Sequence, residues 1–164
     1  MNESELIPDT IILGERNYAA ALDLVIAEAK DELLIFDQDF ARSDYASVAR
    51  YRLLQNFLSN NPLSKLTIIL HNTEFFTTRC PRLYELLETY GHKMVVYETN
   101  DHAKIAKDCF VLADKRHYCR RFHIDQARFK FALDDLETTA SLATRFNELL
   151  EETADTVSVT KLGL

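Results

Sequence analysis

The chain of 164 residues contains no Trp and only three Gly and three Pro, the two residues that most often interrupt regular structure. This leaves little room for long loops or disorder away from the ends. Cysteine is equally scarce: Cys80, Cys109 and Cys119 form neither a CxxC pair nor a zinc spacing, so no disulfide framework is expected. Apolar runs such as residues 66–70 are far too short to span a membrane. We therefore expect one domain with a substantial core.

Positive charge is also in short supply, since the net charge is −7. This balance argues against general binding to nucleic acid or to a membrane surface. The acidic segment 1–5 is followed by no apolar stretch suited to secretion, so the sequence predicts a protein of the reducing cytoplasm. Residues 102–130 nevertheless carry eight Lys and Arg against three Asp, a balance of +5, and the remainder carries −12. Such a basic segment predicts a small anionic ligand, an acidic partner, or pairing with the protein's own acids.

Apolar segments alternate with amphipathic ones through the first hundred residues. Strands are expected at 10–13, 32–36, 65–71 and 93–97. Helices are expected at 16–30, from the cap at residue 43 or 44 to about residue 59, and at 81–90. Ser43 or Asp44 is expected to cap the second helix, and Gly91 to close the third in a left-handed conformation. This order predicts an α/β fold whose sheet is mixed but mainly parallel, with helices on both faces.

The pattern changes after residue 100. Residues 101–107 are expected to form a turn or a short helix, and 110–113 and 118–123 a hairpin joined by 114–117. Residues 129–131 predict a further short strand. A last helix is expected at 136–152, begun by Asp134 or Asp135. Residues 157–164 predict a short strand or a frayed end.

The stretch 108–125 reads DCFVLADKRHYCRRFHID and brings a buried strand next to several basic residues. Arginine binds phosphate oxygens through two nitrogens, so Arg120, Arg121 and His123 are candidate ligands of an anion. Strand alternation would place Arg121 and His123 on one face and Arg120 on the other. The alternative is that these arginines pair with Asp37, Asp39 or Asp125.

Two acidic residues end the second predicted strand. Asp37 and Asp39 lie where open α/β sheets bind ligands, although they also suit a polar turn that caps the next helix. With Asp114 and the three basic residues above, they complete the predicted ligand-binding set. The set His117, His123, Asp114 and Asp125 matches no zinc pattern, so neither a metal nor a cofactor is expected.

Four segments of the chain resemble the phospholipase D superfamily: VIAEAKDELLI at 25–35, the strand at 66–70, VLAD at 111–114 with its hairpin, and RFNELL at 145–150. The chain is most similar to small uncharacterised bacterial proteins of that superfamily that end in Leu-Gly-Leu. The resemblance implies a single phospholipase D-like domain over residues 1–164, with segments 1–8 and 155–164 loose at its ends. It also implies a homodimer, because relatives with one catalytic motif pair to complete a site.

The catalytic motif of that superfamily is H-x-K-x-x-x-x-D. In the first alignment of this motif, Asp114 takes the Asp position, Lys107 the His position and Cys109 the Lys position. The family's His attacks phosphorus and its Lys stabilises the charge of the transition state. The first alignment therefore leaves no nucleophile.

A second alignment uses His102 and Lys104, a true H-x-K, with Asp108 one residue before the required position. A slip of one residue on a strand turns the side chain to the other face, so the first alignment is preferred. The leading hypothesis is a non-catalytic domain that binds a partner or a phosphorylated ligand near residues 108–125. The alternative is an active phosphodiesterase or nuclease that uses His102, Lys104 and Asp108.

Overall fold

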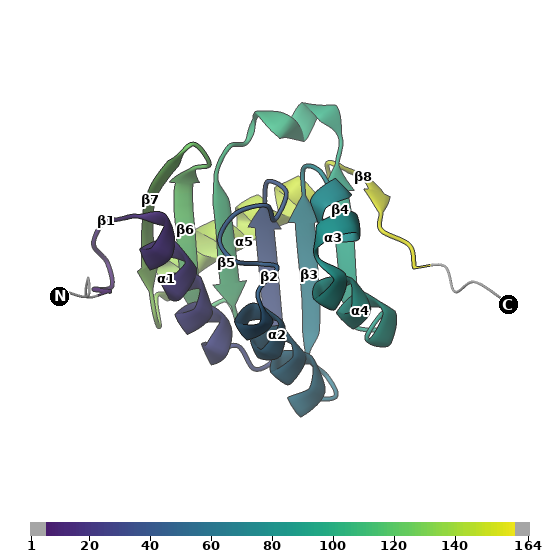
Figure 1. Ribbon diagram of the computed structural model, residues 1–164. Coiled ribbons are helices and arrows are strands. Elements are labelled where there is room, and N and C mark those ends of the chain that lie inside the picture. The colour runs from purple at the N-terminus through teal and green to yellow at the C-terminus, as the bar shows by residue number, and fades with distance from the viewer. Residues whose placement is uncertain (1–5, 160–164) are drawn as a thin grey trace, which may run out of the picture.

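The computed structural model describes residues 6–159, which form one eight-stranded mixed sheet with helices on both faces (Figure 1). The strands are β1 (Ile12–Leu13), β2 (Glu32–Asp37), β3 (Lys65–Leu70), β4 (Met94–Thr99), β5 (Cys109–Ala113), β6 (His117–His123), β7 (Gln126–Ala132) and β8 (Thr153–Thr156). The helices are α1 (Glu15–Glu28), α2 (Val48–Asn60), α3 (Glu74–Arg79), α4 (Pro81–Thr89), α5 (Leu136–Leu150) and the 3₁₀ helix η1 (Asp101–Ile105).

The strands lie in the order β1-β7-β6-β5-β2-β3-β4-β8. β2, β3 and β4 are parallel, whereas every other pairing among the described residues is antiparallel. The sheet is mixed, as the sequence predicts, but it is not mainly parallel. The reason lies in the connections β5–β6 and β6–β7, which are too short for the crossover that parallel neighbours need.

Each face of the sheet has its own core. Leu33 and Ile35 of β2 pack with α1, α2, α3 and α4, whereas Leu34 and Phe36 of the same strand pack with α5. This explains why the second predicted strand is a continuous apolar run, since a strand buried on both faces has no polar side. Figure 1 shows α1, α2, α3 and α4 in front of the sheet and α5 behind it.

The start of α2 differs from the sequence prediction. The hydroxyl of Ser47 accepts a hydrogen bond from the backbone N–H of Arg50 at 3.1 Å, so Ser47 is the cap and the helix begins at Val48. Ser43 and Asp44, the predicted caps, lie in the preceding loop with φ of 69° and 60°. The prediction was wrong because capping residues also favour left-handed turns.

The later elements agree with the sequence more closely. Asp135 caps α5 by accepting a bond from Thr138 N–H at 2.9 Å. Gly91 does not adopt the predicted left-handed conformation, and α4 ends with a bond from Tyr90 N–H to the Leu86 carbonyl at 2.7 Å. The final strand β8 begins earlier than predicted, and the Leu-Gly-Leu tail lies outside the described residues. Within residues 6–159, no helix is long and apolar enough to cross a membrane.

Candidate functional site

One edge of the sheet gathers most of the predicted site residues. The parallel strands β2, β3 and β4 end there, and β5 begins there because it runs antiparallel to β2. The loop after β2 and the 3₁₀ helix η1 lie over this edge (Figure 1). We call it the carboxyl edge and define it as residues 37–47, 71–73, 98–108 and 121–126. It is the position at which α/β sheets bind ligands.

Asp37 belongs to the interior of this edge. Its side chain is 3% exposed and accepts the backbone N–H of Phe40 at 2.7 Å. Burial raises the pKa of Asp37 to about 6, against hydrogen bonds from Phe40 and Cys109 that lower it. Burial likewise raises the pKa of the Cys109 thiol well above its ordinary value. Asp37 therefore anchors the left-handed turn at Phe40, whose φ is 70°.

Asp39 points the other way, toward solvent. One of its oxygens accepts the backbone N–H of Ala41 at 2.9 Å. It lines an open cavity of about 360 Å³ together with Asn72 of the β3–α3 connection and Arg79 at the end of α3. Of the two acids predicted here, only Asp39 is half-exposed at the surface.

His71 ties three segments of the edge together. Its ring nitrogens lie 2.7 Å from the Thr99 hydroxyl and 2.7 Å from the Ala106 carbonyl. Because a carbonyl can only accept, Nε2 carries the hydrogen and Nδ1 accepts from Thr99. Burial lowers the pKa of His71, and the nearby Lys104 and Lys107 add to that shift. The ring is thus a neutral structural link.

Arg121 is fully buried on the α1 side of the sheet. Its two terminal nitrogens bind the carboxylate of Glu15 at 2.6 and 2.8 Å, and it also donates to the carbonyls of His123 and Ile124. Its guanidinium lies over the Tyr18 ring, 5.4 Å from the centroid. All three guanidinium nitrogens of Arg121 thus donate to groups of the same chain. An anion-binding role for Arg121 stays a prediction.

Arg120 lies on the opposite face, as strand alternation predicts. It donates to Asp108 at 3.1 Å, and the other oxygen of Asp108 binds Arg145 of α5. Asp108 is 4% exposed, so two arginines neutralise one buried carboxylate. Part of the basic segment therefore pairs with the protein's own acids, as the alternative proposed. The partners of Arg120 and Arg121 are Asp108 and Glu15, however, and not the predicted Asp37, Asp39 or Asp125.

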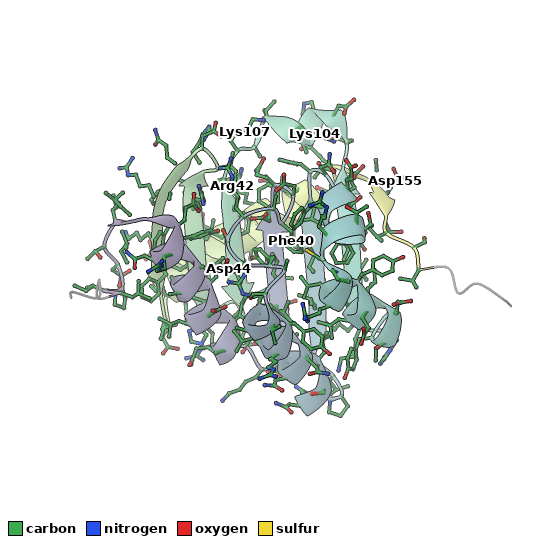
Figure 2. The ribbon with its side chains drawn as sticks, viewed as in Figure 1. Phe40, Arg42, Asp44, Lys104, Lys107 and Asp155 are labelled. Carbon is green, nitrogen blue, oxygen red and sulfur yellow. The ribbon has the colours of Figure 1, made fainter. Side chains whose placement is uncertain are left out.

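His123 remains accessible at the β6–β7 turn, where its ring accepts the backbone N–H of Asp125 at 3.1 Å. Two further basic residues are bonded to this turn through the backbone of Ile124. The Ile124 N–H donates to the carbonyl of Lys107 at 2.7 Å, and the Ile124 carbonyl accepts from the guanidinium of Arg42. Lys107 and Arg42 are both exposed, and Figure 2 shows them with Lys104 at this end of the molecule.

The residues of the second motif alignment have separate partners. His102 is 82% exposed in its side chain and binds Glu152. Lys104 donates to the Thr99 carbonyl at 3.0 Å. Asp108 is held by the two arginines described above. His102 and Arg145 line one cavity of about 470 Å³ between η1 and α5, but neither Lys104 nor Asp108 lines it.

Asp114 lies just after β5, a strand about 17 Å long, whereas Lys107 lies before its start. Its carboxylate accepts three backbone N–H groups, from Lys30 at 2.9 Å and from Asp31 and Glu32 at 2.8 Å each. It thus fixes the connection between α1 and β2. The structure does not bring Asp114 together with His123 at the carboxyl edge.

Replacing Asp114 by alanine is expected to lower the free energy of unfolding by about 1.5 kcal/mol, because three N–H groups lose their acceptor but can reach water. Asp44 offers a matched control, since both residues are left-handed, with φ of 56° and 60°. Urea unfolding of Asp114→Ala and Asp44→Ala separates the lost bonds from the lost conformational preference. Equal losses in the two variants would contradict the role given to the carboxylate.

Sequence reasoning missed Arg42 and Gln38 as parts of this edge, and Arg145 of α5 as a partner of its Asp108. Gln38 donates to the carbonyls of Ala106 and Asp108 at 3.0 and 2.9 Å, which holds the start of β5. Only their positions beside a strand end or in the last helix hinted at such roles. Within residues 6–159, no three side chains of His, Cys, Asp or Glu gather as a metal centre.

Comparison with solved structures identifies the fold. NucT from Helicobacter pylori is 16% identical, with a TM-score of 0.56, and the match covers 88% of this chain and 96% of that one. Nuc from Salmonella typhimurium, a phospholipase D family member, is 10% identical, with a TM-score of 0.61 and coverage of 91% and 99%. The predicted phospholipase D-like fold is confirmed.

TrmBL2, an archaeal chromatin protein with a novel mode of DNA binding, is 13% identical, with a TM-score of 0.65. The match covers 92% of this chain but only 55% of that protein. At such identities the likeness concerns the fold alone. No curated protein sequence matches the chain. A family model described as a domain of unknown function (DUF7931) matches residues 14–162, and the chain therefore belongs to the DUF7931 family.

Proposed function

We propose that this protein is a phospholipase D-fold domain that binds a phosphate-bearing ligand at its carboxyl edge without cleaving it. The observation that carries the proposal is that Lys107, through its backbone carbonyl, and Arg42, through its guanidinium, are both bonded to the backbone of Ile124. Both side chains are exposed, and His123 is exposed on the same turn. Two exposed cations from neighbouring loops, beside an exposed imidazole on the β6–β7 turn, suit the charge and the several acceptor oxygens of a phosphate.

The absence of cleavage follows from the residues at the motif positions. In the preferred alignment Lys107 replaces the attacking His, and the buried thiol of Cys109 replaces the charge-stabilising Lys. Lys107 has no imidazole ring, which is the group that attacks phosphorus in the phospholipase D superfamily. Burial raises the pKa of Cys109 and keeps the thiol neutral, so it cannot offset the transition-state charge. Asp114 occupies the Asp position, and its hydrogen bonds to the α1–β2 connection support a structural role for this residue.

Affinity for inorganic pyrophosphate is expected to fall about ten-fold or more in the variant with Lys107→Ala and Arg42→Ala, because two charge-assisted contacts are lost. Isothermal titration calorimetry at low salt measures this. Lys65→Ala is the control, since Lys65 is exposed at the opposite end of the sheet. Unchanged affinity in the double variant, or no binding by the wild type, would overturn the proposal.

The same assay shows whether the phosphate group belongs to a small molecule or to nucleic acid. TrmBL2 is described as binding DNA, so a short DNA duplex is titrated beside pyrophosphate. A duplex bound more tightly than pyrophosphate, with the same dependence on Lys107 and Arg42, would assign the site to nucleic acid. We also propose the homodimer and the cytoplasmic location implied above, and sedimentation velocity tests the first of these.

The alternative function is phosphodiester hydrolysis with His102, Lys104 and Asp108. It is favoured by one observation, the cavity of about 470 Å³ that His102 lines. We expect no hydrolysis of bis(p-nitrophenyl) phosphate by the wild type. Turnover that disappears in His102→Ala would establish the alternative in place of the non-catalytic proposal.

A further inference from the structure

The two faces of the sheet are unequally covered. On the front, α1 packs against β5, β6 and β7, while on the back the main contacts of α5 are with β4, β5 and β6. Figure 1 shows α5 crossing behind the middle of the sheet, with β1 lying beyond it at the left. Ala132, at the end of β7, still packs in the core formed with α5. Within residues 6–159, the back of β1 and of residues 126–130 of β7 therefore has no helix of its own.

Side chains on this uncovered surface follow from the register. Ile12 and Phe129 pair across β1 and β7 and belong to the front core, so their neighbours Ile11, Leu13 and Arg128 face the back. Ile11 and Leu13 are 54% and 66% exposed. We name this surface the open face and define it as Ile11, Leu13, Phe122, Arg128 and Lys130.

Phe122 and Lys130 join it through β6. Arg120, which faces α5, pairs with Lys130 in the register. The guanidinium carbons of Arg120 and Arg128 lie 5.4 and 5.8 Å from the centre of the Phe122 ring, which places all three on the same side. Within residues 6–159, neither Arg128 nor Lys130 takes part in an ion pair. The open face thus combines exposed aliphatic groups with two cations whose charge is not neutralised.

We propose that the open face docks an amphipathic helix of a protein partner, with aliphatic residues on one side and acidic residues flanking them. From β6 to β1 there are two strand spacings, about 10 Å in all, which is the diameter of one helix. Helices pack against β5 and β6 on both faces of the sheet, so the space beside them on the back fits one further helix of that layer. Leu13 and Ile11 supply the apolar contact, and Arg128 and Lys130 select an acidic rim.

Other occupants fit the open face less well. A second copy related by a twofold axis would bring the same cations toward each other. Stacking of nucleic-acid bases needs a free aromatic ring, but the Phe122 ring is already flanked by two arginines. Anionic membranes are opposed by the net charge of −7 and by Asp125 and Asp135, which lie just beyond the two ends of β7.

The test uses two synthetic helices of about five turns with identical leucine faces, flanked in one by Glu and in the other by Lys. Fluorescence anisotropy should show that the full-length protein prefers the Glu-flanked helix by about ten-fold or more. The variant with Arg128→Glu and Lys130→Glu should reverse this preference, and Leu13→Glu should weaken both helices. Leu24→Glu, on an exposed position of α1, should change nothing.

The proposal is overturned if the wild type binds neither helix, binds both equally, or is unaffected by Leu13→Glu. It is also overturned if Leu13→Glu instead abolishes self-association, binding to phosphatidylglycerol vesicles or binding to single-stranded DNA. The variant with Lys107→Ala and Arg42→Ala must bind the Glu-flanked helix like the wild type. That last comparison separates the open face from the proposed phosphate site.

Discussion

Replacing Glu15 by alanine is expected to destabilise the protein by about 2 kcal/mol, because it removes the carboxylate that pairs with the buried Arg121. The loss is smaller than for a fully buried pair, because the Glu15 side chain is 55% exposed and solvent screens part of the interaction. Arg121 is fully buried, and both of its terminal nitrogens bind Glu15. Without that carboxylate, the guanidinium keeps only the carbonyls of His123 and Ile124 and the ring of Tyr18. Urea unfolding at neutral pH measures the loss.

Two comparisons show whether this loss comes from the stranded charge. Arg16→Ala, at the next position of α1, should leave stability unchanged, because Arg16 is exposed. Adding Arg121→Met to Glu15→Ala should recover part of the loss, because the unpaired charge is then removed. If Glu15→Ala unfolds at the same urea concentration as the wild type, the pair has no structural importance.

The pH dependence of this pair has a defined sign. The hydrogen bond from Arg121 lowers the pKa of Glu15 against the opposing effect of burial. A group whose pKa is lowered by folding stabilises the protein above its unfolded pKa, and that stability is lost as the pH falls through the folded pKa. The difference between the wild type and Glu15→Ala should therefore shrink in acid.

Asp37→Asn is expected to stabilise the protein by about 2 kcal/mol at pH 7.5, although Asp37 lies at the predicted ligand-binding edge. Burial raises its pKa to about 6, from an ordinary value of 3.8. Folding then favours the protonated acid, so stability is fully present below about pH 4 and is lost as the pH rises through about 6. The amide keeps an acceptor for the N–H of Phe40 but carries no charge that burial must neutralise.

The stability of Asp37→Asn and of the wild type should therefore converge near pH 4 and separate toward pH 7.5, as followed by urea unfolding across this range. Asp39→Asn is the matched control, since Asp39 makes a similar turn bond but is half-exposed. A wild type that is more stable than Asp37→Asn at pH 7.5 would contradict the assignment. It would show that the ionised carboxylate is held by stronger contacts than those from Phe40 and Cys109.

The sequence predicts the elements well because each carries a local signal. The continuous apolar run of β2 reflects burial on both faces, and the two short connections after β5 require a hairpin meander. Errors arise where one residue type serves two conformations. Ser43 and Asp44 suit a helix cap and a left-handed turn equally, and only the loop over the carboxyl edge decides between them.

The candidate site was predicted less completely, because adjacent positions in the sequence separate across the sheet. Arg120 and Arg121 lie on opposite faces, one held by Asp108 and the other by Glu15. Glu15 is more than one hundred residues away in the sequence, so no local pattern could reveal this partner. In the same way, no local pattern could show that Arg42 and Lys107 are both bonded to the backbone of Ile124.

By itself, the sequence determined the α/β class, the hairpin after residue 108 and the resemblance to phospholipase D, because periodicity and turn chemistry act between near neighbours. Only the tertiary structure decided which charged side chains form ion pairs within the chain and which remain exposed. The same holds for the open face, because whether a strand surface is covered depends on where a distant helix packs. Long-range contacts therefore determine which of the basic residues are available to a ligand.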